Sequence, residues 1–406
     1  MTRETNGLVI RQASDKTILR LLVFMWIFLT SGFVVTNDVI SSLMTMALWA
    51  VVVLFLAISC FYIDRKIMIA FTMLIACKFI SSLLNNENIR NLFVQSFAFL
   101  GALFFACTYK LEDFKHAFIW VMGKIALISL IGFFAYLCVP ELENLFRLRN
   151  SAGTLCNNWY LFVHIAGLDR NLGLFWEPGA FQTFLCLALM LEVLEKRINV
   201  KKIILFLVTI ITTFSTTGYI GIAFILLLAI SGNKGANNKY KYFFLFIILA
   251  ISVLAYCYQD KLFGNGNTVF GKVTYYLDSG TINEQVTSAS VRVNSIVQPF
   301  FVFLSHPLFG VGYEGLNLRL YEYTHNMNTC TFVNFFADYG IGYGLVMLGG
   351  FFKLARKLTG NKFQTIVAVL IFAVITISEN YVDNSFFALL ALYGWGSNNE
   401  RVMQCV

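Results

Sequence analysis

Residues 201–232 read KKIILFLVTIITTFSTTGYIGIAFILLLAISG, and this stretch decides how the chain is folded. Two apolar runs follow the lysines, and a polar segment that reaches Thr217–Gly218 separates them. A membrane-spanning helix needs roughly 20 apolar residues. The stretch is therefore either one long helix or two short helices in a hairpin. A single helix would invert the sidedness of everything that follows it.

The composition of the whole chain places it in a membrane. Of its 406 residues, 58% are hydrophobic and only 13% are charged, and the mean hydropathy is +0.72. Soluble domains carry about 25% charged residues. We therefore predict an all-α polytopic membrane protein with a single integral membrane domain over residues 1–406. The net charge of +8 does not indicate nucleic acid, because the basic residues lie in short loops between apolar runs.

The apolar runs predict about twelve transmembrane helices, which divide the outer surface into short turns and two long loops. The helices are expected near residues 18–36, 39–61, 67–84, 91–109, 117–139, 174–193, 201–216, 218–232, 242–258, 327–351, 363–378 and 383–397.

The positive charges favour the hairpin at Thr217–Gly218. With it, 20 of the 30 Lys and Arg residues fall on one face, 8 fall on the other, and Lys78 and Lys124 lie inside spans. Short cytoplasmic loops are rich in Lys and Arg. Both termini are thus predicted to be cytoplasmic, and the long loops 140–172 and 259–326 to be external. Long loops in compact proteins are usually functional.

Ionisable residues at the external edge of the membrane are the candidate site. Residues 170–181 read RNLGLFWEPGAF and place Arg170 and Glu177 where the first long loop enters an apolar run. Arg292, Arg319 and His325 lie in the second long loop. Arginine binds phosphate bidentately and keeps its charge, and glutamate or histidine can accept a proton from a hydroxyl. The set suits attack of a sugar hydroxyl on a carbon that bears a phosphate-type leaving group.

Arg292 belongs to a predicted amphipathic helix that is too short to span and is expected to lie in the membrane interface, with a bend at Pro299. Its apolar side consists of Val293, Ile296, Val297, Phe300, Phe301 and Leu304.

Each candidate also has a structural interpretation. Glu177 before Pro178 could simply begin a helix, and Arg292 could anchor a surface helix. Arg170 and Arg319 could be ordinary interface arginines, and His325–Asn326 could cap the next helix.

Three further features of the sequence bear on its chemistry. Asp338 lies inside a predicted span, where a charge costs about 2.5–3.5 kcal/mol on insertion scales, so we expect it to pair with Lys78 or Lys124. The GxGxxG pattern at residues 310–315 lacks the strand–turn–helix setting of a dinucleotide site. No Asp-x-Asp pair occurs in the sequence to hold a metal for nucleotide-sugar chemistry.

Three segments together resemble one family. RNLGLFWEPGAFQTFL at residue 170, VRVNSIVQPFFVFLSHPLFGVGYEG at 291 and HNMNTCTFVNFFADYGIGYG at 325 are similar, in order, to motifs of Wzy-type O-antigen polymerases, and the related O-antigen ligases share the last of them. The resemblance implies a metal-independent C-type glycosyltransferase of the bacterial inner membrane, without cofactors and with a periplasmic active site.

The resemblance also implies roles for the candidate residues. Such an enzyme transfers a glycan from undecaprenyl pyrophosphate to a lipid-linked repeat unit. Arg170, Arg292 and Arg319 would hold the pyrophosphates, and Glu177 or His325 would be the base. Membrane lipid and a chain-length regulator protein would be partners. An O-antigen ligase, and a 12-helix transporter or lipid-linked oligosaccharide flippase, are the alternatives. Clustering of the distinctive residues at one face favours an enzyme.

Overall fold

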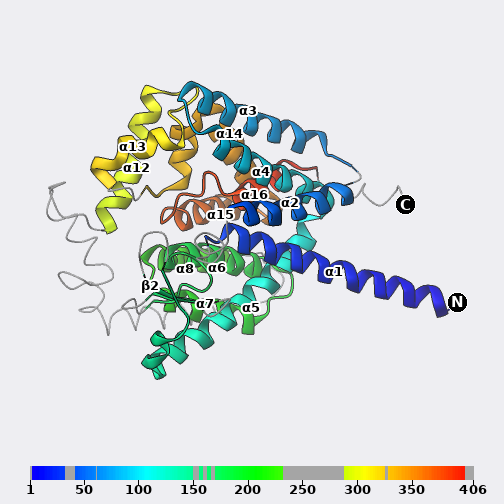
Figure 1. The fold of residues 1–406 in the computed structure, drawn as a ribbon. Helices are drawn as coiled ribbons and strands as arrows, with labels where there is room; N and C mark the ends of the chain where they lie inside the picture. Colours follow the sequence, from blue (N-terminus) through cyan, green and yellow to red (C-terminus); the bar gives the residue numbers. More distant parts are fainter. Residues whose placement is uncertain are drawn as a thin grey trace. The chain divides into compact units, whose positions relative to one another are not determined.

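The computed structural model describes residues 2–32, 42–60, 62–149, 155–158, 162–165, 170–231, 288–324 and 328–397. Helices dominate these ranges, as Figure 1 shows. The chain divides into two compact units: unit 1 comprises residues 1–63 and 100–213, and unit 2 comprises residues 64–99 and 214–406. Each unit has its own buried apolar core.

Unit 1 is organised around the long helix α5. Its helices are α1 (Thr2–Thr30), α2 (Ser42–Ser59), the end of α4 (Ile89–Thr108), α5 (Leu111–Cys138), α6 (Pro178–Val193) and α7 (Val200–Thr212). Helix α5 packs against α1, α6 and α7, and α6 lies beside α7. Aromatic rings pack at the α1 side of this core. The Trp26 ring contacts the Trp49 and Phe105 rings edge-on, at centroid distances of 5.0 and 5.5 Å.

The first long loop contains a small sheet, which corrects the purely helical prediction. A 3-10 turn, η2 (Pro140–Asn144), leads into the antiparallel strands β1 (Arg147–Arg149), β2 (Leu155–Asn158) and β3 (Val163–Ile165), in the order β1-β2-β3. His164 stacks on Tyr136 at 4.1 Å and lies 3.1 Å from a Glu143 carboxylate oxygen. Strands of three or four residues are too short to show an alternating pattern in the sequence.

Unit 2 is organised around α14 (Thr331–Leu358). Its other helices are α3 (Arg65–Leu84), the start of α4, α8 (Thr216–Ile230), α12 (Ser288–Ser305), α13 (Tyr313–Thr324), α15 (Lys362–Ile375) and α16 (Ser385–Trp395). Helix α14 packs against α3, α12, α13, α15 and α16. Gly350 and Gly394 allow α14 and α16 to touch, because a Cβ at either position would collide with the backbone of the other helix.

The stretch that opened the sequence analysis forms two helices. Helix α7 ends at Thr212, α8 begins at Thr216, and Phe214 between them has a φ of 47°. The alternative that residues 201–232 form a single long helix is therefore wrong. Ser and Thr side chains compete for backbone hydrogen bonds at such breaks, and Thr212 and Thr213 each donate a hydroxyl to a carbonyl one turn earlier. The sidedness that a hairpin would impose stays a prediction.

Among the described residues, 4 helices are long and apolar enough to cross a membrane, namely α3, α4, α5 and α14. The protein is therefore a polytopic helical membrane protein. Helices α6, α8, α15 and α16 coincide with predicted spans but have only 16, 15, 14 and 11 residues, fewer than the roughly 20 that a full crossing needs. The predicted span 242–258 lies outside the described residues. The number of twelve spans stays a prediction.

Candidate functional site

The loop that precedes α6 in unit 1 is held rigidly. Leu172, Leu174 and Phe175 are fully buried, and the Phe175 ring stacks on Phe181 at 5.4 Å. Gly173 has a φ of +58°, and a Cβ there would lie 2.8 Å from the Phe181 ring, so only glycine fits. The buried apolar side chains fix the path of the loop, and with it the residues at its two ends.

Asn171 connects this loop to two helices. Its side chain is fully buried and donates to the Ser129 hydroxyl of α5 at 3.2 Å and to the Thr212 hydroxyl of α7 at 3.0 Å. Its carbonyl oxygen accepts the Gly173 N–H at 3.0 Å, and its own N–H donates to the Thr212 carbonyl. Every polar group of the side chain is therefore used for positioning.

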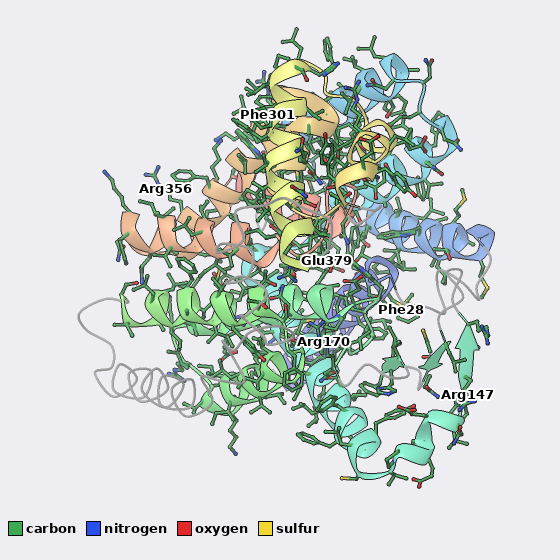
Figure 2. The ribbon with its side chains drawn as sticks, turned by 90° about the vertical axis from the view of Figure 1, so that its left-hand side faces the viewer. Phe28, Arg147, Arg170, Phe301, Arg356 and Glu379 are labelled. Carbon is green, nitrogen blue, oxygen red and sulfur yellow. The ribbon has the colours of Figure 1, made fainter. Side chains whose placement is uncertain are left out.

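Arg170, next to Asn171, lies against the C-terminal end of α7 (Figure 2). Its Nε donates to the carbonyl oxygen of Thr213, the C-cap of that helix, at 2.8 Å. A cation is favoured at a helix C-terminus because the backbone carbonyls there carry partial negative charge. The half-buried guanidinium is thus fixed through Nε at the end of α7.

Glu177 lies at the other end of the loop and is the N-cap of α6, with Pro178 at the first helical position. Glu177 thus begins a helix, which is the structural interpretation given for it from the sequence. Its side chain, however, makes no capping hydrogen bond, and the residue is exposed. Within the part of the chain that the structure describes, the carboxylate has no ion pair either. Unit 1 therefore presents a fixed cation and an unengaged carboxylate at the two ends of one buried loop.

In unit 2, Arg292 is half-buried on α12. Ser295 follows one turn later, so both side chains lie on the same side of the helix. The Ser295 hydroxyl accepts the Thr329 N–H at 3.1 Å, and the Asn294 side chain donates to the Tyr323 carbonyl at 3.3 Å. This side of α12 therefore adjoins the segment that leads into α14. His325 belongs to that segment and lies outside the described residues.

The opposite side of α12 is apolar and exposed, whereas its location in the membrane interface stays a prediction. Val297, Phe300, Phe301 and Leu304 are 40% to 59% exposed, although they are apolar, whereas Asn294 and Ser295 are buried. Phe301 is labelled in Figure 2. Such a distribution suits a helix whose apolar side meets lipid. Pro299 lies inside the helix, as expected.

Arg319 is exposed on α13, whose buried side carries Leu316 and Leu320. Among the residues that the structure describes, no hydrogen bond or ion pair holds its guanidinium. Arg170 and Glu177 thus belong to unit 1, and Arg292 and Arg319 to unit 2. A pocket that all of them share stays a prediction.

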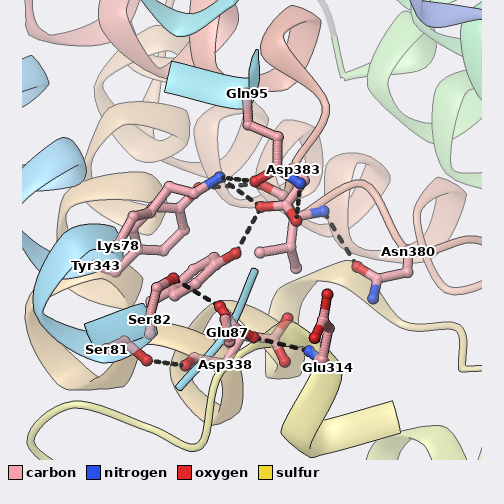
Figure 3. Close-up of polar contacts among 12 residues, drawn as sticks. Lys78, Ser81, Ser82, Glu87, Gln95, Glu314, Asp338, Tyr343, Asn380 and Asp383 are labelled. Carbon is pink, nitrogen blue, oxygen red and sulfur yellow. Dashed lines mark hydrogen bonds and ion pairs between the residues drawn. The ribbon is translucent and has the colours of Figure 1, made fainter. Parts of the chain in front are cut away.

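A buried polar network in unit 2 escaped the sequence analysis (Figure 3). Lys78 on α3 is fully buried, and its Nζ lies 2.6 Å from an Asp383 carboxylate oxygen and 2.9 Å from the Gln95 side-chain oxygen. The Gln95 amide and the Tyr339 hydroxyl also donate to Asp383, at 2.9 and 2.8 Å. The expected pairing of Asp338 with a lysine is therefore wrong for Lys78.

Neither carboxylate oxygen of Asp338 has a hydrogen-bond partner among the described residues. Lys124 belongs to unit 1, where its Nζ lies 5.6 Å from the centre of the Trp120 ring. The sequence contained one signal for Asp383 as the partner of Lys78. Asp383 stands in the short polar segment NYVDNS between two apolar runs, and a carboxylate placed there can reach an intramembrane lysine.

One group of potential metal ligands was found among the described residues, formed by Glu112, His116 and Glu195 in unit 1. The Lys115 ammonium lies 2.5 Å from Glu112 and 3.3 Å from Glu195. The Lys115 ammonium already forms ion pairs with both carboxylates, so we assign no metal to them. Metal independence of the protein stays a prediction.

The family described as O-antigen ligase matches residues 203–351. Over this segment, which is less than half of the 406 residues, the chain is similar to that family of membrane proteins. The matched segment contains Arg292, Arg319, His325 and Asp338, and it leaves out Arg170 and Glu177. Comparisons with curated proteins and with solved structures gave no match.

Proposed function

We propose that this protein is an O-antigen polymerase. It would transfer a growing glycan from undecaprenyl pyrophosphate to the non-reducing end of a lipid-linked repeat unit on the periplasmic side of the inner membrane. The observation that carries the proposal is the loop of unit 1, in which Arg170 is fixed by Thr213 and Glu177 keeps an exposed carboxylate without a capping bond. The family match supports the class of enzyme.

The reaction assigns complementary tasks to these groups. The acceptor hydroxyl oxygen forms a bond to the anomeric carbon of the donor while the bond from that carbon to the diphosphate oxygen breaks. The hydroxyl proton passes to Glu177 or His325, and undecaprenyl pyrophosphate leaves with the electron pair. Arg170, Arg292 and Arg319 would stabilise the developing negative charge on the diphosphate. The protein's own residues supply all of these charges, so no metal is required by the proposal.

Two structural features suit a lipid-linked substrate. The exposed apolar ridge of α12 would lie at the depth of the lipid headgroups, and Arg292 lies on the same helix, where a lipid-borne diphosphate would be found. Glu177 begins α6, so its carboxylate would lie where a buried apolar helix meets the external loop. The ligase alternative uses the same donor and differs in its acceptor, lipid A-core.

Deletion of the gene separates the candidate functions. We expect the deletion strain to make lipopolysaccharide with a single repeat unit, and the intact gene to restore the ladder. Bare core with accumulated carrier-linked polymer would instead show a ligase, and repeat units held on the cytoplasmic side would show a flippase.

Complementation with variants tests the residues. Glu177→Gln should lower polymerisation by about 10²–10⁴-fold if Glu177 is the general base, whereas Glu141→Gln, at another exposed acid of the first loop, should keep the ladder. Arg292→Lys should fail nearly as completely as Arg292→Ala, because a lysine cannot replace the bidentate fork. A full ladder from Arg292→Lys would reduce Arg292 to a surface anchor.

A further inference from the structure

Helix α14 is broken at its centre, and a neighbouring loop fits into the break. Gly340 has a φ of 79° and a ψ of −178°, and a Cβ there would collide with the Leu308 carbonyl. The N–H groups of Val311 and Gly312 donate to the carbonyls of Ala337 and Asp338 at 2.9 Å each. A Cβ at Gly310, the first glycine of the GxGxxG pattern, would likewise collide with the Ala337 and Asp338 carbonyls, so this glycine serves close packing of the loop on the helix.

The side chain of Asp338 lies at this break and is the least satisfied charged group in the described structure. The residue is fully buried, and neither carboxylate oxygen has a hydrogen-bond partner. Its backbone carbonyl is engaged by the Ser81 hydroxyl at 2.9 Å as well as by Gly312. The backbone is thus fixed on two sides while the carboxyl group is left without a donor.

The surrounding groups cannot supply that donor. Lys78 is engaged by Asp383 and Gln95, and the Tyr339 hydroxyl also points to Asp383. The Tyr343 hydroxyl donates to the Val382 carbonyl at 2.9 Å. Every nearby donor therefore already serves another acceptor.

Glu87, the other acid beside Asp338, has its own partners (Figure 3). One of its oxygens accepts the Ser82 hydroxyl at 2.6 Å, and the other accepts the Glu314 N–H at 2.8 Å. Lys78 compensates Asp383, and Glu87 is half-buried and accepts two hydrogen bonds, so Asp338 is the one fully buried carboxylate of the three that has no counter-charge. An unpaired buried charge is far more costly than an unpaired neutral polar group, so one more cation is needed.

We propose that the carboxyl group of Asp338 is a proton-binding site, occupied in the resting protein, and that the bound proton keeps the loop 307–312 docked on the break in α14. A proton fits better than a metal ion. Among the described residues, the only group of three ligand side chains close enough to share a metal is Glu112, His116 and Glu195, which does not include Asp338. This inference does not depend on the proposed polymerase activity.

The titratable and charged groups around Asp338 define what else could respond to pH. They are Lys78 and Cys77 of α3, Glu87 of the turn after it, Tyr313 and Glu314 of α13, Tyr339 and Tyr343 of α14 itself, and Asp383 before α16. Burial, with the nearby charge of Asp383, raises the pKa of Tyr313 to about 12, so this tyrosine is neutral between pH 5 and pH 8.

Thermal unfolding of the purified full-length protein between pH 5 and pH 8 tests the site. The folded wild type would hold a proton that the unfolded chain releases, so its melting temperature should fall as the pH rises. Asp338→Asn mimics the neutral acid and should remove most of that fall. Asp383→Asn is the matched control: it leaves Lys78 unpaired and should melt lower than wild type at every pH.

Two measurements on the same proteins complete the test. Infrared spectra of the wild type at neutral pH should contain the carbonyl band of a protonated buried carboxyl group, and Asp338→Asn should lack it. Amide hydrogen exchange at Val311 and Gly312 should become faster above pH 8 in the wild type than in Asp338→Asn at the same pH.

Absence of the protonated-carboxyl band in the wild type would overturn the proposal without requiring any variant to fold. An unchanged pH dependence in Asp338→Asn would also overturn it. So would a wild-type melting temperature that rises with the concentration of sodium or potassium at constant ionic strength, because that result would identify a metal cation at Asp338.

Discussion

At the scale of single residues, the charges inside unit 2 are paired in a way that cannot be guessed from hydropathy. Lys78 is fully buried, yet it lies 305 positions from its partner, Asp383. Gln95 contacts both groups and completes the cluster. A buried ion pair contributes little net stability, whereas the loss of one member leaves a charge without compensation.

Asp383→Asn should therefore destabilise the protein by about 3–5 kcal/mol, because the Lys78 ammonium would stay buried beside a neutral amide. Thermal unfolding in a single detergent measures the effect. The double variant Lys78→Met with Asp383→Leu removes both charges and should recover most of the loss. If Asp383→Asn melted like the wild type, the pair would not exist in the folded protein.

At the scale of elements, the loop of residues 170–177 before α6 is held in place by its neighbours. Its apolar residues are buried, Asn171 ties it to α5 and α7, and the Gly173 carbonyl accepts the Val163 N–H of β3 at 2.6 Å. The small sheet, the loop and the ends of three helices thus support each other. The loop in turn sets the positions of Arg170 and Glu177.

Asn171→Ala should lower stability by about 1–3 kcal/mol, because it leaves the buried Gly173 N–H without its side-chain acceptor and removes the two hydrogen bonds that join the loop to α5 and α7. Polymerisation should fall further in Asn171→Ala than in Ser129→Ala, because Ser129→Ala removes only one of these hydrogen bonds. Melting curves of both variants and the length of the lipopolysaccharide ladder are the measurements. Equal melting of Asn171→Ala and the wild type would show that the loop is held by its apolar contacts alone.

At the scale of the whole molecule, the membrane topology decides which side of the membrane each loop occupies. The break between α7 and α8 removes the single-helix alternative, and the distribution of Lys and Arg then predicts cytoplasmic termini. This sidedness must hold for Arg170, Glu177 and Arg292 to work on a periplasmic substrate.

Reporter fusions check this topology directly. A fusion at Gly235 should behave as cytoplasmic, and one at Asn265 as external, since the predicted span 242–258 separates them. Alkaline phosphatase activity, which requires export, and green fluorescence, which is favoured in the cytoplasm, give opposite readouts at each site. The reverse pattern would invert the proposed location of the second long loop.

The sequence by itself determined the membrane class, the positions of most helices and the amphipathic pattern of α12, and its charges favoured two helices over residues 201–232. These depend on local composition and periodicity, which are properties of neighbouring residues. Only the tertiary structure decided that Asp383 rather than Asp338 meets Lys78, that Asn171 anchors Arg170, that the first loop forms a sheet, and that the glycines near residue 310 fit a break in α14. Those features join residues far apart in the chain, and their energies arise only when packing has removed water and left each polar group to find a partner.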